Sequence, residues 1–268
     1  NVLAATVNRV SDSDRARRLQ RQRQRTASAI KDGDRVSGRL TCDAHPAPGA
    51  AGRARLGYTP PVRPDRTDEL RALMADRILV LDGATGTALQ SLDLRPDDFG
   101  GAELEGCNEA LVLSRPEIIL GVHRRYLDAG ADLIETDSFG GTPLVLDEYG
   151  LGERAEEINR LAAELAREAA DGASTPARPR FVVGSMGPTT KAISVTGGIT
   201  FRELEAAFLV QARGLLAGGV DLFAVETCQD TRTTKAALLA VHEAMDEAGV
   251  RRPILVSGTI EPTGTLLA

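Results

Sequence analysis

Residues 218–227 read GGVDLFAVET, and the same pattern occurs earlier as AGADLIET at residues 129–136. Each copy runs from a glycine, through an aspartate and a short apolar run, to a Glu-Thr pair. Glycine commonly ends a helix, and an uninterrupted apolar run is typical of a strand buried on both faces of a parallel sheet. The repeated pattern therefore predicts a strand that follows a helix and ends in polar residues.

Three further apolar runs have the same character. The five predicted strands are RILVLD (77–82), ADLIET (131–136), RFVVGS (180–185), VDLFAVET (220–227) and PILVSG (253–258). Amphipathic segments separate them, among them residues 153–170 and 231–248, which we expect to be helices. About five strand–helix units in alternation predict an α/β fold with a parallel sheet, either open and doubly wound or closed as a barrel.

The ends of two helices can be read directly from the sequence. Ser114 and Pro116 predict a capped helix start, and Gly130 predicts the end of that helix. Thr200 followed by Glu203 is a capping box. These signals place the helices between the predicted strands.

Ligands of parallel α/β proteins bind where the strands end, in open sheets and in barrels alike. The predicted strand ends collect polar side chains at one rim, namely Asp82, Glu135, Thr136, Ser185, Glu226, Thr227 and Ser257. A partly buried acid needs a hydrogen-bond donor or a cation. Glu135 and Glu226 therefore predict either salt bridges to neighbouring Arg or Lys residues, or a pair of carboxylates facing the ammonium group of an amino acid.

The first strand runs into LVLDGATGTALQ at residues 79–90. Asp82 stands at the strand exit, and Gly83 and Gly86 allow a ligand to approach the backbone. The glycines lack the spacing of a nucleotide-binding motif. Because paired acids also cleave glycosides, a barrel hydrolase that uses Asp82 and Glu226 stays open at this point.

Bulk properties narrow the class of protein. The 268 residues carry a net charge of −6, 3% aromatic residues and no Trp, which argues against a nucleic-acid surface. No apolar stretch reaches the roughly 18 residues of a membrane span. Cys42, Cys107 and Cys228 are scattered, which fits neither a disulfide framework nor a paired-cysteine metal site and favours a cytoplasmic location. His123 and His242 sit in amphipathic segments and are expected to be core or surface residues.

The first 76 residues differ from the rest of the chain. They hold an excess of Arg and a net charge of +6, whereas residues 77–268 carry −12. Arg, Pro, Ala and Gly dominate, with too few large apolar residues to form a packed core. We therefore expect residues 1–76 to be a mostly disordered extension and residues 77–268 to form the folded domain.

Six motifs in chain order resemble the homocysteine-binding domain of cobalamin-dependent methionine synthases, from about residue 77 to the end. They are LDGATGT, CNEALVLSRPEII, DAGADLIETDSFGGT, VVGSMGPTTK, GGVDLFAVETCQD and VSGTIEPTGTLLA. The resemblance implies a TIM-type (β/α)8 barrel that binds homocysteine, a homocysteine S-methyltransferase activity, and cobalamin- and folate-binding modules as partners in the intact enzyme. It implies that Asp82, Gly83 and Glu226 hold the amino group of homocysteine, with Thr136, Asp137 and Ser185 as further rim positions.

The resemblance also implies cofactors. In the family a zinc ion held by three cysteinates stabilises the homocysteine thiolate, which attacks the methyl group of methylcobalamin. Neither Cys107 nor Cys228 matches a ligand position, so the zinc cysteines are expected to be absent from this chain. The expected reading is an N-terminal fragment, a partial barrel of about five strand–helix units that is inactive alone and supplies no catalytic or metal residue. The alternative is a non-catalytic amino-acid-binding module, or a half-barrel that pairs with a second chain.

Overall fold

The computed structural model describes residues 2–3, 63–191, 193, 197–262 and 264–266. The strands are β1 (Val2–Leu3), β2 (Leu133–Glu135), β3 (Phe181–Met186), β4 (Leu222–Cys228) and β5 (Ile254–Gly258). The long helices are α2 (Thr67–Asp76), α6 (Pro116–Ala129), α8 (Ala155–Ala173), α9 (Phe201–Gly218) and α10 (Thr231–Ala248). The short helices are α3 (Thr85–Gln90), α4 (Pro96–Phe99), α5 (Leu111–Ser114) and α7 (Pro143–Leu146), with 3-10 turns at Ala102–Leu104, Asn108–Ala110, Asp147–Tyr149 and Gly152–Arg154.

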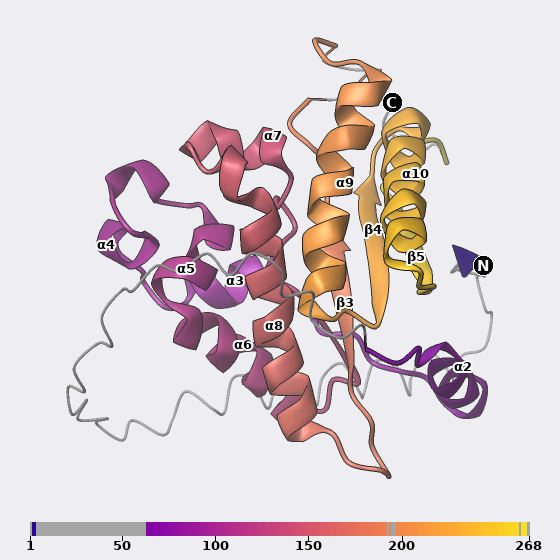
Figure 1. Cartoon of the computed structure of the whole chain (residues 1–268). Coiled ribbons are helices and arrows are strands. Elements are labelled where there is room, and N and C mark those ends of the chain that lie inside the picture. The colour runs from indigo at the N-terminus through magenta and orange to yellow at the C-terminus, as the bar shows by residue number, and fades with distance from the viewer. Residues whose placement is uncertain (1, 4–62, 192, 194–196, 263, 267–268) are drawn as a thin grey trace. The chain divides into compact units, whose positions relative to one another are not determined.

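The strands form one parallel sheet in the order β1-β5-β4-β3-β2. Strands β3, β4 and β5 each lie beside the strand that precedes them in the sequence. Helices α8, α9 and α10 lie side by side along one face, with α9 in front of β3 and α10 in front of β5 in Figure 1. A doubly wound sheet has helices on both faces and a change of direction in its strand order. The observed order is instead that of a barrel wall.

The predicted first strand, residues 77–82, is wrong as a regular strand. Only Leu81 forms a bridge, parallel to Leu133. The reason lies in Asp132, whose carboxylate accepts a hydrogen bond from the backbone N–H of Val80 at 3.0 Å. The N–H of Val80 therefore bonds to a side chain, whereas its carbonyl accepts from the backbone N–H groups of Asp132 and Leu133. Asp82 still lies at the edge of β2, since its N–H donates to the carbonyl of Leu133 at 3.0 Å.

The two faces of the sheet carry separate apolar clusters. Large side chains of β2, β3 and β4 alternate between them, as the pleat of a strand requires. The helix side includes Ile134, Val182, Phe223 and Val225. The inner side includes Leu133, Phe181, Val183, Leu222 and Ala224.

Helix α2 differs from the predicted extension. It lies within residues 1–76, and its Leu70, only 2% exposed, packs into the inner cluster. Arg66, just before this helix, stands over the ring of Phe181 at 4.2 Å. Ordered structure therefore begins before residue 77 because the helix buries an apolar residue against the sheet. For residues 1 and 4–62, the predicted disorder concerns positions outside the described residues.

The helix boundaries mostly follow the sequence signals. The capping box is present, since Glu203 N–H donates to Thr200 Oγ1 at 3.2 Å and the Glu203 carboxylate accepts from Thr200 N–H at 2.7 Å. Gly130 ends α6 in the left-handed conformation. The predicted cap at Ser114 is wrong. Its hydroxyl bonds back to the carbonyl of Ala110, and Arg115 takes the cap position.

The aspartates of the repeated pattern have the same role in both copies. Asp132 lies before β2 and accepts from the N–H of Val80, while Asp221 lies before β4 and accepts from the N–H of Val182 at 2.8 Å. Each carboxylate also pairs with an arginine, Asp132 with Arg77 and Asp221 with Arg167. These buried acids tie neighbouring strands together, and their charges are compensated.

Helices α8 and α9 approach each other at backbone distance. A Cβ atom placed on Gly218 would lie 2.4 Å from the carbonyl oxygen of Arg160 and 2.5 Å from Cβ of Ala163. At Gly214 it would lie 2.4 Å from the carbonyl oxygen of Glu156. Two glycines one turn apart on α9 therefore allow a contact that a larger residue would prevent.

We expect Gly218→Ala to lower the free energy of unfolding by about 1–3 kcal/mol, although alanine is normally the better helix former, because the added methyl group overpacks the contact. Gly172→Ala in α8 is the matched control, since a Cβ there meets nothing within 4 Å. It should stabilise the protein by about 0.5–1 kcal/mol. Urea unfolding of both variants measures the difference, and equal effects at the two sites would contradict the close packing of α8 and α9.

Candidate functional site

The candidate site lies on the inner side of the sheet, where the strands end. The inner-facing positions of β2, β3 and β4 include Leu133, Val183 and Ala224. Two residues further along each strand, the same face carries Glu135, Ser185 and Glu226. The apolar inner face thus changes into a polar rim within one pleat, as the sequence predicts.

Asp82 joins this rim through a backbone contact. Its Oδ1 accepts a hydrogen bond from the N–H of Glu135 at 2.9 Å. Its Oδ2 is buried and has no hydrogen-bond partner among the described residues. Ser185 donates from Oγ to Oε1 of Glu226 at 2.5 Å. Asp82, Glu135 and Glu226, hereafter the acid cluster, are close enough for their charges to interact.

The acid cluster is electrostatically uncompensated. Burial, and then the charge of Glu226, raise the pKa of Asp82 to about 7. Burial and the charges of Glu226 and Asp82 raise the pKa of Glu135 to about 8. Burial also raises the pKa of Glu226, against the hydrogen bond from Ser185. In the described part of the chain, none of the three forms a salt bridge with Lys, Arg or His, so the predicted alternative of arginine pairing is not what the structure has.

The loop after β2 explains the other predicted rim residues. Thr136 is buried, and its Oγ1 accepts from the N–H of Ser185 at 3.0 Å, which aligns the two strand ends. Asp137 does not join the acid cluster. It is 6% exposed and has its pKa raised to about 8 by burial and by the charge of Glu109. Gly83 is open, since a Cβ there would meet no atom within 4 Å, and a ligand has room to approach it.

Two buried amides that the sequence did not single out hold this loop. Gln211 of α9 donates to the carbonyl of Ser138 at 2.6 Å, and Asn159 of α8 donates to the carbonyl of Gly141 at 2.6 Å. Both side chains are fully buried. In the sequence, each of these residues is an amide within the apolar stripe of a helix, and this was the signal that could have identified them. Between these anchors, Phe139 is 44% exposed, and its carbonyl accepts from the N–H of Gly187 at 2.9 Å.

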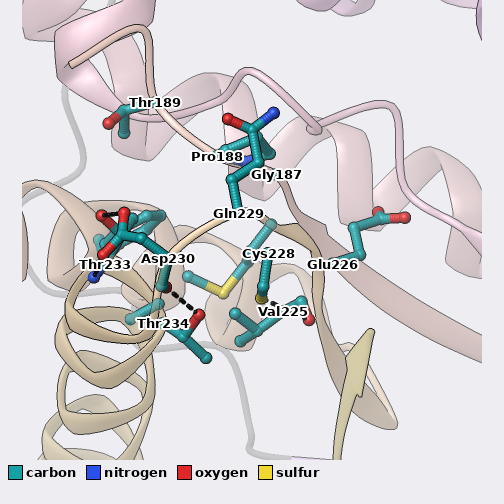
Figure 2. Close-up of a pocket in the computed structure, with 13 residues that line it drawn as sticks. Gly187, Pro188, Thr189, Val225, Glu226, Cys228, Gln229, Asp230, Thr233 and Thr234 are labelled. Atoms are coloured by element: carbon teal, nitrogen blue, oxygen red, sulfur yellow. Dashed lines mark hydrogen bonds between the residues drawn. The ribbon is translucent and has the colours of Figure 1, made fainter. Parts of the chain in front are cut away.

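The end of β4 separates Glu226 from Cys228. Thr227 has a left-handed φ of 56°, unusual for a β-branched residue, and the pairing with β5 shifts register between Val225 and Cys228. Cys228 consequently packs on the helix side together with Val225. Figure 2 shows the Glu226 side chain pointing away from Cys228 and Asp230. The pocket drawn there has a volume of about 20 Å³, enough for one water but not for an amino acid.

The described residues do not fit a zinc ion. Among them, no group of three His, Cys, Asp or Glu side chains could hold a metal. Cys107 and Cys228 are buried in different apolar clusters, and burial raises the pKa of the Cys107 thiol to about 12. His123 is fully buried, and burial lowers its pKa to about 4, whereas His242 is exposed on α10. Both histidines are thus the core and surface residues predicted.

Comparisons with known proteins agree on one family. A family model described as homocysteine S-methyltransferase matches residues 79–268. Methionine synthase of Mycobacterium leprae is 44% identical over 201 residues, which are 75% of this chain and 16% of that protein. Methionine synthase of Mycobacterium tuberculosis is 42% identical over 199 residues, or 74% of this chain and 16% of that protein. The chain therefore spans only a small part of the length of these relatives.

Solved structures extend the likeness to the fold. The oxidized form of the homocysteine methyltransferase MmuM from Escherichia coli has a TM-score of 0.59 and 27% identity, over 74% of this chain and 68% of that one. The metallated form has a TM-score of 0.60 and 26% identity, over 74% and 69% of the two chains. The predicted α/β fold, related to barrel-like methyltransferases, is confirmed. Among the described residues, no helix has the length and apolar character needed to cross a membrane.

The raised pKa values predict an unusual pH dependence of stability. The native pKa values of Asp82 and Glu135 exceed the value of about 4 expected for the unfolded chain, so the native state binds more protons between about pH 4 and 8. The free energy of unfolding should therefore fall as pH rises through this range. In the double variant Asp82→Asn and Glu135→Gln this fall should be smaller, although Asp137 keeps its own contribution.

Urea unfolding at several pH values from 5 to 8 measures this slope. Asp246→Asn is the control, because Asp246 is an exposed acid paired with Arg251 and should leave the slope unchanged. An identical slope in the double variant and the unaltered chain would show that these two acids are ionised in both states.

Proposed function

The chain belongs to the homocysteine S-methyltransferase family, and we propose that its acid cluster binds the α-ammonium group of homocysteine. The family and the methionine synthase relatives make it a homocysteine methyltransferase domain of the methionine synthase type. The observation that carries the proposal is the meeting of Asp82 and Glu226 at one rim, where no Lys, Arg or His of the described residues pairs with them. A ligand that brings its own positive charge would compensate both acids.

The rim also suits the rest of a small amino acid. The inner face beneath the acid cluster is apolar, with Val183 and Ala224 one pleat below. A short aliphatic side chain can lie against such a surface and lose contact with water. Gly83 gives the ligand access to backbone N–H and C=O groups beside Asp82. Thr136 and Ser185 are proposed to position the acids and not to contact the reacting atoms.

Methyl transfer itself needs groups that we do not assign to the described residues. A thiolate is the nucleophilic form of homocysteine, and zinc would supply its activation in the intact enzyme. The described residues do not fit zinc, so the part proposed for them is the binding of homocysteine. Methylcobalamin as methyl donor, the cobalamin- and folate-binding modules as partners, and a cytoplasmic location remain predictions.

The chain alone is therefore proposed to bind homocysteine without methylating it. In the alternative prediction, a binding module that works with a second chain, the rim would bind the amino acid in the same way. A barrel hydrolase that uses Asp82 and Glu226 would need one ionised carboxylate opposite a protonated one. The comparisons lend no support to that reading.

Isothermal titration calorimetry with L-homocysteine under reducing conditions tests the proposal. The unaltered chain should bind, and Asp82→Ala or Glu226→Ala should weaken binding about tenfold or more, because each removes a charged acceptor of the ammonium group. Glu243→Ala is the control, since Glu243 is an exposed acid on α10 that does not belong to the acid cluster. Binding that survives both acid substitutions would overturn the assignment, and so would a complete lack of binding.

A further inference from the structure

The acid cluster contains one carboxylate more than a pair of acids around an ammonium requires. Glu135 faces the rim from β2, between Asp82 and the strand that carries Ser185. Among the described residues, neither of its carboxylate oxygens takes part in a hydrogen bond or ion pair, although its backbone N–H is bonded to Asp82. Its side chain is partly buried. A partly buried acid that lacks a partner has lost part of its hydration, so a cationic ligand would stabilise it.

Each acid of the cluster keeps an acceptor oxygen for that ligand. Oδ2 of Asp82 has no partner, while Oδ1 is used by Glu135 N–H. Oε1 of Glu226 is used by Ser185, which leaves Oε2. A primary ammonium group has three N–H donors, and the cluster offers three carboxylates. This one-to-one match is lost for a secondary or tertiary amine.

We propose that Glu135 is the third acceptor of the substrate's ammonium group and makes the site specific for primary amines. This inference rests on the proposed function of the acid cluster and adds a residue that selects the ligand. Glu135 would act on binding, as a specificity determinant, and not on the transferred methyl group.

The charge of the cluster gives the inference a second, independent signature. Three ionised carboxylates around one ammonium would leave two uncompensated charges, and the empty site holds protons near neutral pH. Two other titratable groups of the described residues interact with the cluster. The pKa of Tyr126 of α6 is raised by burial and by the charge of Asp82, and the pKa of Cys228 is raised by burial and by the charges of Asp230 and Glu226, so both stay neutral at pH 7. Arg125 beside Tyr126 is exposed. Binding of a cation should therefore release protons from the acids to the solvent.

The experiment compares L-homocysteine with N-methyl-L-homocysteine by calorimetry at pH 7.5, in two buffers of different ionisation enthalpy. The unaltered chain should bind the N-methyl compound about tenfold or more weakly and release about one proton per homocysteine bound. Glu135→Ala should bind homocysteine more weakly and discriminate less between the two ligands. Glu135→Gln keeps an acceptor oxygen, and it should release fewer protons while retaining discrimination.

Glu148→Gln, at an exposed acid outside the cluster, is the control and should match the unaltered chain. Circular dichroism confirms that each variant is folded. If the unaltered chain binds homocysteine but does not discriminate against the N-methyl compound, or if both Glu135 variants behave as the unaltered chain does, only this inference fails. If the unaltered chain does not bind homocysteine, the proposed function fails together with it.

Discussion

Among the described residues, the buried aspartates before β2 and β4 pair with arginines, whereas Asp82 and Glu135 at the carboxyl end of the sheet have no cation as partner. Before β2 and β4, Asp132 and Asp221 accept hydrogen bonds from backbone N–H groups and pair with arginines. After the strands, Asp82 and Glu135 meet other acids, and burial favours their neutral forms. Breaking a buried ion pair typically costs about 3–5 kcal/mol, so the arginine-paired end is suited to holding the sheet together. The acids at the carboxyl end of the sheet can instead be compensated by a positively charged ligand.

Strand geometry brings the acids of the cluster together at the carboxyl end of the sheet. The inner face of each strand repeats every second residue, so Leu133, Val183 and Ala224 are followed by Glu135, Ser185 and Glu226. These three residues step along by one pleat from strand to strand, because Glu135 pairs with Val183 and Ser185 pairs with Ala224. The register shift at Thr227 ends the pattern and sends Cys228 to the helix side. The acids therefore share a surface with Ser185 and not with a thiol. This supports amino-acid binding by the rim, while methyl transfer depends on groups that we do not assign here.

Patterns of local origin could be predicted from the sequence, and features that depend on neighbouring elements could not. The apolar runs, the capping box at Thr200 and the end of α6 at Gly130 follow from short-range signals, and the structure has them. The strand predicted at residues 77–82 was wrong as a regular strand, since only Leu81 forms a bridge to β2 and the N–H of Val80 bonds to the side chain of Asp132. Helix α2 was missed because its few apolar residues find their partners across the sheet. The convergence of the acids at one rim could be predicted from the parallel topology. That no Lys, Arg or His of the described residues pairs with them could be seen only in the structure.

The contact between α8 and α9 has a consequence for how this rim can change. Asn159 and Gln211 belong to two helices whose backbones touch at Gly214 and Gly218, and they anchor the carbonyls of Gly141 and Ser138. Both ends of this loop are therefore held by hydrogen bonds from helices outside it. Phe139, exposed between them, lays its ring against Gly187, where an added Cβ would come within 2.7 Å of it. Natural variation at position 139 would therefore alter the surface beside the rim while the helix-anchored backbone on either side keeps its place.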